Sequence, residues 1–88
     1  MNAVPRIRLY TSRWCAQCEQ ARALLRLHGL AFEEIELDGD SHACCRLRLL
    51  TGGASAPQVV VDERPIGGYP ELAALLRADM REAFHGDA

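Results

Sequence analysis

The stretch Arg13-Trp14-Cys15-Ala16-Gln17-Cys18 decides the fold, because it places two cysteines three residues apart between a predicted strand and a predicted helix. Residues i and i+3 share one face of a helix, so the two sulfurs can meet. Cys15 would lie among the unpaired N–H groups of the first helical turn. The positive end of the helix and the adjacent Arg13 should lower the pKa of the Cys15 thiol, whereas Cys18, one turn deeper, should stay a thiol.

This pair of cysteines is open to three interpretations. The two residues can form a redox-active pair, they can be small apolar residues of an amphipathic helix, or they can be half of a zinc site. A C-x-x-C motif beside a βαβ pattern favours the redox pair. A zinc site would need further ligands from His42, Cys44 or Cys45, and their spacing is not a usual second half of such a site.

Length and composition indicate one globular domain that spans residues 1–88. Apolar residues make up 49% and charged residues 25%, so we expect disorder only at Gly86–Ala88. No apolar run approaches the roughly 20 residues that a membrane span needs, and Met1–Pro5 lacks the apolar region of a secretory signal. We therefore expect a cytoplasmic protein without membrane contact, in which the four cysteines are thiols rather than structural disulfides.

Charge is unevenly distributed along the chain. The net charge is −2, all ten basic residues are arginine, and residues 1–30 carry five of them against the single acidic residue Glu19. A run of acidic residues follows without a base between them: Glu33, Glu34, Glu36, Asp38 and Asp40. A positive surface near Cys15 would suit an anionic thiol partner, although each arginine can equally belong to an ordinary solvated face. Nothing in the sequence resembles a nucleic-acid-binding stripe.

The hydrophobic pattern predicts a strand before the cysteine motif and a helix after it. Arg6–Thr11 alternates polar and apolar residues, which indicates a strand with Ile7 and Leu9 on one face. Ala16–His28 has the spacing of an amphipathic helix, and Gly29 is well placed to end it. The predicted core stripe of this helix comprises Ala21, Leu24, Leu25 and His28.

A second strand and a second helix follow. Ala31–Leu37 is predicted to be a short strand that ends at the turn Asp38–Asp40. Ser41 is expected to cap a helix that runs to about Leu50.

The remainder of the chain predicts a hairpin and a last helix. Gln58–Val61 is largely β-branched, as expected for a central strand buried on both faces. A tight turn at Asp62–Arg64 leads into Pro65-Ile66 and gives an antiparallel hairpin, and a helix begins near Pro70 and reaches about Phe84. The order β-α-β-α-β-β-α predicts an α/β fold, with a four-stranded mixed sheet covered by three helices and a parallel, right-handed first βαβ unit.

Three motifs in this order resemble the glutaredoxin family of the thioredoxin fold, over about Ile7 to Leu76. The first is Tyr10-Thr11 before Cys15-Ala16-Gln17-Cys18, the second is Ser55-Ala56-Pro57-Gln58, and the third is Ile66-Gly67-Gly68-Tyr69-Pro70-Glu71-Leu72. The resemblance implies a monomeric thiol–disulfide oxidoreductase in which Cys15 is the nucleophile, Cys18 is the resolving thiol and Pro57 is a cis-proline. Because Pro57 has no N–H, the backbone of Ala56 is free to pair with an extended thiol substrate.

The resemblance also implies glutathione as co-substrate, with no tightly bound cofactor or metal. The partners it implies are glutathione and disulfide-containing or glutathionylated proteins, with ribonucleotide reductase as a further candidate. Its implied glutathione-binding residues are Arg13, Gln17, Ser55, Ala56, Pro57, Gly68, Tyr69 and Glu71. Three positions depart from the family pattern: Ser12 stands where the family often has lysine, Cys44 where it has arginine or glutamine, and Pro70 where it offers a backbone N–H.

Two alternatives stay open beside the glutathione-dependent enzyme. Ala16-Gln17 resembles the glutaredoxin-like hydrogen donors of ribonucleotide reductase, which thioredoxin reductase reduces, although their later Gly-Phe-Arg-Pro signature is absent and Ile66-Gly67-Gly68 favours glutaredoxin. A module that binds a metal or an iron–sulfur cluster through Cys15 is an alternative of another class. Cys44 and Cys45 are adjacent on a helix and cannot both face the core, and His28 and His85 are expected at the surface rather than as bases.

Overall fold

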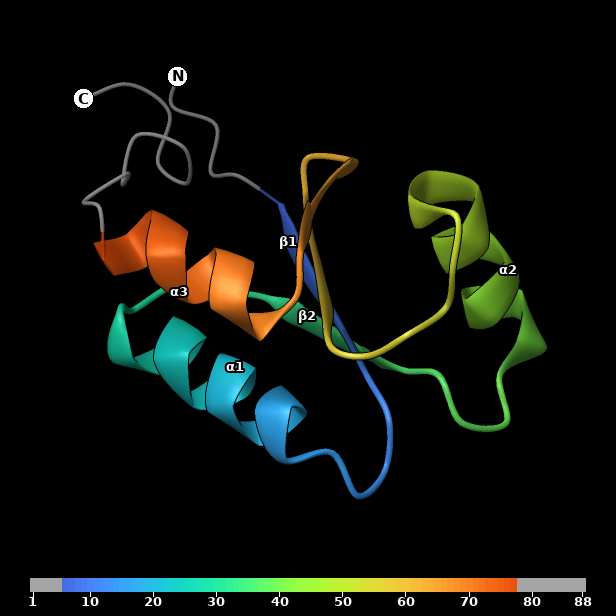
Figure 1. Ribbon diagram of the computed structural model, residues 1–88, viewed down its shortest axis with the longest axis horizontal. Coiled ribbons are helices and arrows are strands. Elements are labelled where there is room, and N and C mark those ends of the chain that lie inside the picture. The colour runs from blue at the N-terminus through green and yellow to red at the C-terminus, as the bar shows by residue number, and fades with distance from the viewer. Residues whose placement is uncertain (1–5, 78–88) are drawn as a thin grey trace.

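The computed structural model describes residues 6–77 and contains the seven elements in the predicted order (Figure 1). They are β1 (Ile7–Thr11), α1 (Ala16–Leu27), β2 (Glu33–Glu36), α2 (Ser41–Thr51), β3 (Gln58–Val61), β4 (Arg64–Gly67) and α3 (Tyr69–Arg77). The predicted end of the last helix at Phe84, the predicted disorder at Gly86–Ala88 and the placement of His85 lie outside the described residues. Within residues 6–77, no helix is long and apolar enough to cross a bilayer.

The four strands form one mixed sheet in the order β2-β1-β3-β4. Strand β1 pairs in parallel with β2 and antiparallel with β3, which in turn pairs antiparallel with β4. Tyr10 lies opposite Gln58 in the β1–β3 ladder. The residues just before β3 therefore lie beside the end of β1, from which the chain enters the cysteine motif.

Helices cover both faces of the sheet, and each face has its own apolar core. Helices α1 and α3 lie side by side on one face, and α2 lies apart from them (Figure 1). The core beneath α1 and α3 comprises Ile7, Leu9, Ala21, Leu25, Leu30, Val59, Val61, Leu72 and Leu76. The core beneath α2 comprises Tyr10, Leu37, Ala43, Leu47 and Val60. The predicted α/β fold, a four-stranded mixed sheet covered by three helices, is confirmed.

Strand β1 is buried along its whole length, because both of its faces are covered. Ile7 and Leu9 share the face beneath α1 and α3, as the alternation predicts. On the other face the Arg8 side chain is only 4% exposed, and its guanidinium lies 2.7 Å from a carboxylate oxygen of Glu63. The guanidinium carbon of Arg8 also lies 6.0 Å from the centre of the Tyr10 ring. An arginine in this alternating strand is therefore part of the interior rather than of a solvated face.

The helix ends differ from the prediction in two details. Asp40, rather than Ser41, caps α2, because its Oδ1 accepts a hydrogen bond of 3.0 Å from the Ala43 N–H. A carboxylate at this position also interacts favourably with the positive end of the helix. His28 is exposed beyond the end of α1, as expected of a surface residue and contrary to its place in the predicted core stripe. The buried stripe of α1 comprises Cys18, Ala21 and Leu25. Gly29 ends the helix as predicted, with a left-handed φ of 68°.

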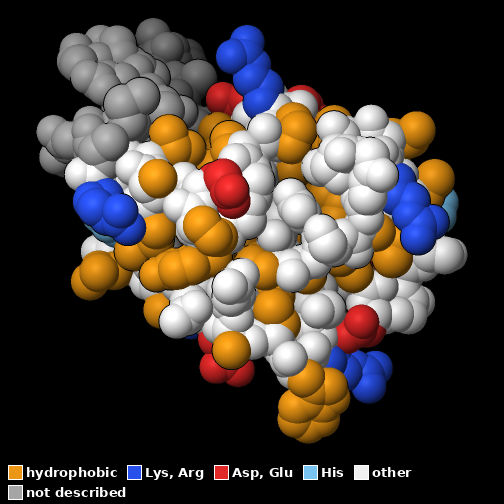
Figure 2. All heavy atoms as spheres, viewed as in Figure 1, with side chains coloured by type: hydrophobic (Ala, Val, Ile, Leu, Met, Phe, Trp, Pro, Cys, Tyr) orange, Lys and Arg blue, Asp and Glu red, His pale blue; other side chains and the backbone are white. Residues whose placement is uncertain are grey.

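The uneven charge along the sequence is balanced in space. The parallel pairing of β1 with β2 brings the acidic run beside the arginines of the first half of the chain. The resulting ion pairs are Arg6–Glu33, Arg13–Asp38 and Arg22–Glu34. Charged side chains of both signs are scattered around the face seen in Figure 2, with apolar side chains between them. The positive surface expected near Cys15 is therefore largely neutralised by the acidic run.

Candidate active site

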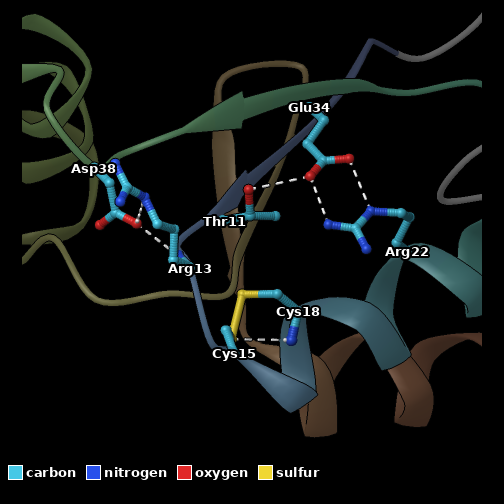
Figure 3. A network of polar contacts seen from close by, with 7 residues as sticks. All are labelled: Thr11, Arg13, Cys15, Cys18, Arg22, Glu34 and Asp38. Atoms are coloured by element: carbon cyan, nitrogen blue, oxygen red, sulfur yellow. Dashed lines mark hydrogen bonds and ion pairs between the residues drawn. A yellow bond between two sulfur atoms is a disulfide. The ribbon is translucent and has the colours of Figure 1, made fainter.

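Cys15 is the N-cap residue of α1. Its backbone is extended, with φ −119° and ψ 100°, and its Sγ accepts a hydrogen bond of 3.0 Å from the Cys18 N–H. The two sulfurs are joined in a disulfide, with the Cα atoms 5.2 Å apart (Figure 3). Cys15 is half-buried, whereas Cys18 is only 1% exposed. An attacking thiol can thus reach Cys15 far more easily than Cys18, and in the reduced pair the same N–H would stabilise a Cys15 thiolate.

Arg13 is turned toward Asp38 rather than toward the cysteines (Figure 3). Its backbone N–H donates a hydrogen bond of 2.6 Å to Oδ2 of Asp38, and its Nε lies 3.7 Å from the same oxygen. The guanidinium is therefore already paired with a carboxylate. The direct support for a Cys15 thiolate comes from the helix N-terminus, and a contribution from Arg13 stays a prediction.

The cis-proline segment lies next to the cysteine motif. The Ala56–Pro57 peptide bond is cis, as the resemblance implied. The β1–β3 register places Pro57, which precedes Gln58, beside the end of β1. Pro57 is buried, whereas Ala56 is half-buried and Ser55 is exposed. Ala56, half-buried, thus precedes the cis-proline beside the end of β1.

A groove of about 520 Å³ lies between the C-terminal end of α2, strand β4 and the start of α3. We call it the α2–α3 groove. It is lined by Leu50, Thr51, Gly53, Ser55, Gln58, Pro65, Ile66, Gly67, Gly68 and Glu71. Of the residues implied as glutathione-binding, Ser55, Gly68 and Glu71 line this groove. Arg13, Gln17, Ala56, Pro57 and Tyr69 are not part of its lining.

The Glu71 side chain, which lines this groove, caps the N-terminal end of α3. Its Oε1 accepts a hydrogen bond of 2.8 Å from the Gly68 N–H, which is the reciprocal half of a capping box. The backbone of Gly67, with φ 116°, passes so close that a Cβ atom there would lie 2.7 Å from Cγ of Glu71. A Cβ atom on Gly68 would lie 3.1 Å from the Pro57 carbonyl oxygen. Gly67 therefore leaves room for the Glu71 side chain, and Gly68 allows the start of α3 to approach the cis-proline segment.

A polar network on the α1 side of the cysteine motif was not predicted from the sequence. Two nitrogens of Arg22 donate to the two carboxylate oxygens of Glu34 at 2.9 and 2.6 Å, and the hydroxyl of the buried Thr11 donates to Oε2 at 3.1 Å (Figure 3). The hydrogen bond from Arg22 lowers the pKa of Glu34, and the same bond raises the pKa of Arg22. The network ties α1 to β1 and β2. Only the i, i+4 spacing of Cys18 and Arg22 could have suggested that Arg22 lies near the site.

The second pair of cysteines lies on α2. Cys44 is partly buried, and its thiol donates a weak hydrogen bond of 3.6 Å to the Leu37 carbonyl, whereas Cys45 is exposed. The prediction that the two cannot both face the core is confirmed. Among residues 6–77, no three side chains of histidine, cysteine, aspartate or glutamate are grouped closely enough to hold a metal ion. The structure therefore does not bring the Cys15 pair together with His42, Cys44 or Cys45.

Trp14 is the other feature that sequence reasoning missed. Its side chain is 99% exposed, and its φ of 54° lies in the left-handed region. A residue with a Cβ atom pays about 1 kcal/mol or more in that region. The residue directly before Cys15 is thus both strained and solvent-exposed.

The fold and the site together define a class of protein. An accessible cysteine caps a helix, is bonded to a buried cysteine one turn later, and lies beside a cis-proline on a four-stranded mixed sheet. A disulfide that opens and closes at such a helix N-terminus is the reaction centre of a thiol–disulfide oxidoreductase of the thioredoxin fold.

Comparisons with known proteins identify the family. The glutaredoxin family model matches residues 7–66. A glutaredoxin of Pseudomonas aeruginosa is 35% identical over 81 residues, covering 92% of this chain and 96% of that protein. Glutaredoxin 3 of Escherichia coli is 33% identical over 69 residues, covering 78% of this chain and 83% of that protein. The chain therefore belongs to the glutaredoxin family.

Solved structures agree on the fold. The crystal structure of wheat glutaredoxin matches with a TM-score of 0.73 and 27% identity, covering 88% of this chain and 79% of that one. The crystal structure of a buckwheat glutaredoxin–glutathione complex matches with a TM-score of 0.73 and 23% identity, covering 85% of this chain and 71% of that one.

Proposed function

We propose that this protein is a glutathione-dependent oxidoreductase that reduces protein disulfides and mixed glutathione disulfides through Cys15 and Cys18. The observation that carries the proposal is the hydrogen bond from the Cys18 N–H to the accessible Cys15 Sγ. A donor fixed at a helix N-terminus favours a thiolate, which is the form that attacks a disulfide. The family and the buckwheat complex with glutathione support glutathione as the co-substrate.

The reaction consists of two thiol–disulfide exchanges. The Cys15 thiolate attacks one sulfur of the substrate, the substrate S–S bond breaks, and the leaving thiolate takes up a proton. Cys18 then loses its proton and attacks Cys15 Sγ, which releases the second thiol and forms the Cys15–Cys18 disulfide. Two glutathione molecules return the pair to the dithiol and become glutathione disulfide. When the first leaving group comes from a glutathionylated protein, a second glutathione can resolve the intermediate in place of Cys18.

The contacts for glutathione would be fewer than the family pattern offers. Ser12 and Cys44 carry no charge, and Pro70 has no N–H to donate. The Arg13 guanidinium is paired with Asp38, and the Glu71 carboxylate already accepts the Gly68 N–H. We therefore propose that glutathione pairs mainly with the Ala56 backbone and binds weakly. Gln17, exposed in the first turn of α1, and the backbone near Tyr69 can add donors.

The test is a coupled assay of hydroxyethyl disulfide reduction with glutathione and glutathione reductase, beside the same assay with thioredoxin reductase. Cys15→Ser should abolish activity in either assay, whereas Cys18→Ser should retain reduction of the small glutathione mixed disulfide and lose reduction of protein disulfides. Turnover with thioredoxin reductase alone would overturn glutathione dependence and favour the hydrogen-donor alternative that Ala16-Gln17 suggests. Full activity of Cys15→Ser would overturn the mechanism itself.

A further inference from the structure

Trp14 presents its indole to solvent immediately before the nucleophile. It lies in the loop between β1 and α1, its side chain is 99% exposed, and it is the only tryptophan of the chain. The loop lies at an edge of the molecule in Figure 1, and apolar side-chain atoms project from that edge in Figure 2. Tryptophan is highly buried on average, because its large apolar surface is costly to leave in water. Packing within residues 6–77 therefore does not account for this side chain.

The loop holds Trp14 in place between two anchored neighbours. The Arg13 backbone N–H is bonded to Asp38 at 2.6 Å, and Cys15 is fixed as the cap of α1. Between them Trp14 has a φ of 54°, a conformation that bulky residues rarely adopt. Such strained residues cluster at sites that bind or react, where the strain positions a side chain. The backbone of Trp14 is therefore held next to Cys15, and the indole extends from it into solvent.

The chemistry around Cys15 indicates what the indole contacts. A reacting substrate must bring a sulfur within bonding distance of Cys15 Sγ, so the groups that flank this sulfur lie over the chain neighbours of Cys15. Trp14 and Ala16, on either side of it, are both apolar and exposed. The arginine nearest in sequence, Arg13, has its Nε 3.7 Å from Oδ2 of Asp38, so a carboxylate beside it partly balances its charge. This surface fits an apolar side chain, which a polypeptide can supply and glutathione, with its two carboxylate ends, lacks.

We propose that Trp14 is a specificity-determining residue that packs against an apolar side chain flanking the disulfide cysteine of a polypeptide substrate. The inference rests on the proposed function, in which Cys15 is the nucleophile. Tryptophans at the centre of a contact often dominate its energy, because the indole covers a large area at little cost in conformational freedom. Through this apolar contact, the enzyme would bind polypeptide disulfides more tightly than small disulfides without a charged interaction.

Kinetics with matched substrates test this role. Two peptides that differ only in flanking the same intermolecular disulfide with leucine or with serine are compared with hydroxyethyl disulfide. Trp14→Ala should lower kcat/KM for the leucine peptide about tenfold relative to hydroxyethyl disulfide, mainly through KM, and much less for the serine peptide. Trp14→Phe should retain most of the wild-type kcat/KM for the leucine peptide. Leu49→Ala removes another exposed apolar side chain, at 82% exposure. This control variant should leave the ratios of kcat/KM between the three substrates unchanged.

Fluorescence gives a second readout that needs no turnover. In a reduced variant that combines Cys18→Ser with Cys44→Ser and Cys45→Ser, Cys15 is the only thiol left to react. It attacks a peptide activated as a 2-pyridyl disulfide, the Cys15–peptide bond forms, and pyridine-2-thiol leaves. The Trp14 emission should move to shorter wavelength with the leucine peptide and not with the serine peptide. Equal spectra with the two peptides, or equal losses for all three substrates in Trp14→Ala, would overturn the proposal. Absence of all turnover in the wild type would refute the proposed function instead, and the two spectra would still decide the role of Trp14.

Discussion

The ion pair between Arg22 and Glu34 should add measurably to stability, in a pH-dependent way. The pair is bidentate, at 2.9 and 2.6 Å, and its side chains are 26% and 31% exposed. Exposed pairs contribute about 0.2 to 1 kcal/mol, and good bidentate geometry places this pair near the upper end. A double-mutant cycle of Arg22→Ala and Glu34→Gln should therefore give a coupling of about 1 kcal/mol. For a domain of this size, that energy corresponds to about 4 to 8 °C in Tm.

The pH dependence follows from the direction of the pKa shift. Arg22 lowers the pKa of Glu34 in the folded state, so folding favours the ionised carboxylate. The stabilisation is thus fully present above the ordinary value of 4.5, and it is lost as the pH falls through the lower, folded-state value. Urea unfolding of the four proteins of the cycle at about pH 7 and about pH 3 should show a smaller coupling at the second pH than at the first.

The ion pair between Arg6 and Glu33 is a matched control, because Glu33 neighbours Glu34 on β2. Arg6 and Glu33 are 3.9 Å apart and their side chains are 71% and 57% exposed, so their cycle should give a coupling near zero at both pH values. The reasoning is refuted if the two cycles give equal couplings at about pH 7, or if the Arg22–Glu34 coupling is the same in acid. Thermal unfolding of the same variants provides an independent measurement.

Three further outcomes follow from the backbone and the caps. Asp40→Ala should destabilise the fold by about 1 kcal/mol and Ser41→Ala by much less in urea unfolding, because the first residue is the cap of α2. Gly67→Ala should cost more than about 1 kcal/mol, since its Cβ would meet Glu71 Cγ at a left-handed φ, and Glu71→Ala should relieve part of the cost in a thermal melt. Trp14→Gly should be more stable than Trp14→Ala by about 1 kcal/mol in calorimetry, because the φ of 54° suits glycine and the side chain packs on nothing. A lower stability of the glycine variant would contradict the strain at this position.

The sequence predicted the architecture because local patterns determine it. Hydrophobic period, turn residues and the Cys15–Cys18 spacing are local signals, and all seven elements follow from them. The helix ends were less predictable, because Asp40 and Ser41 are both good caps and only the backbone geometry distinguishes them.

Only those residues of the site that belong to a recognisable motif were predicted from the sequence. The placement of Cys15, Cys18 and Pro57 followed from the cysteine motif and the family resemblance. The partners of Arg13 and Arg22 could not be predicted, since Asp38 and Glu34 are distant in sequence and meet these arginines only through the parallel pairing of β1 with β2. The exposure of the Trp14 side chain could not be predicted either, because tryptophan is highly buried on average.

The hydrogen bond at the start of α1 means that one atom is both the capping acceptor of the helix and the reactive group. Anything that frays the first turn of α1 therefore also removes the support of the nucleophile, and a thiolate, as a stronger acceptor than a thiol, holds that turn more firmly. Serine is among the best N-cap residues, so Cys15→Ser keeps the turn closed while it removes the chemistry, whereas Cys15→Ala loses both. In the reduced state the two variants should be equally inactive, yet amide hydrogen exchange at Cys18 should be faster in the alanine variant.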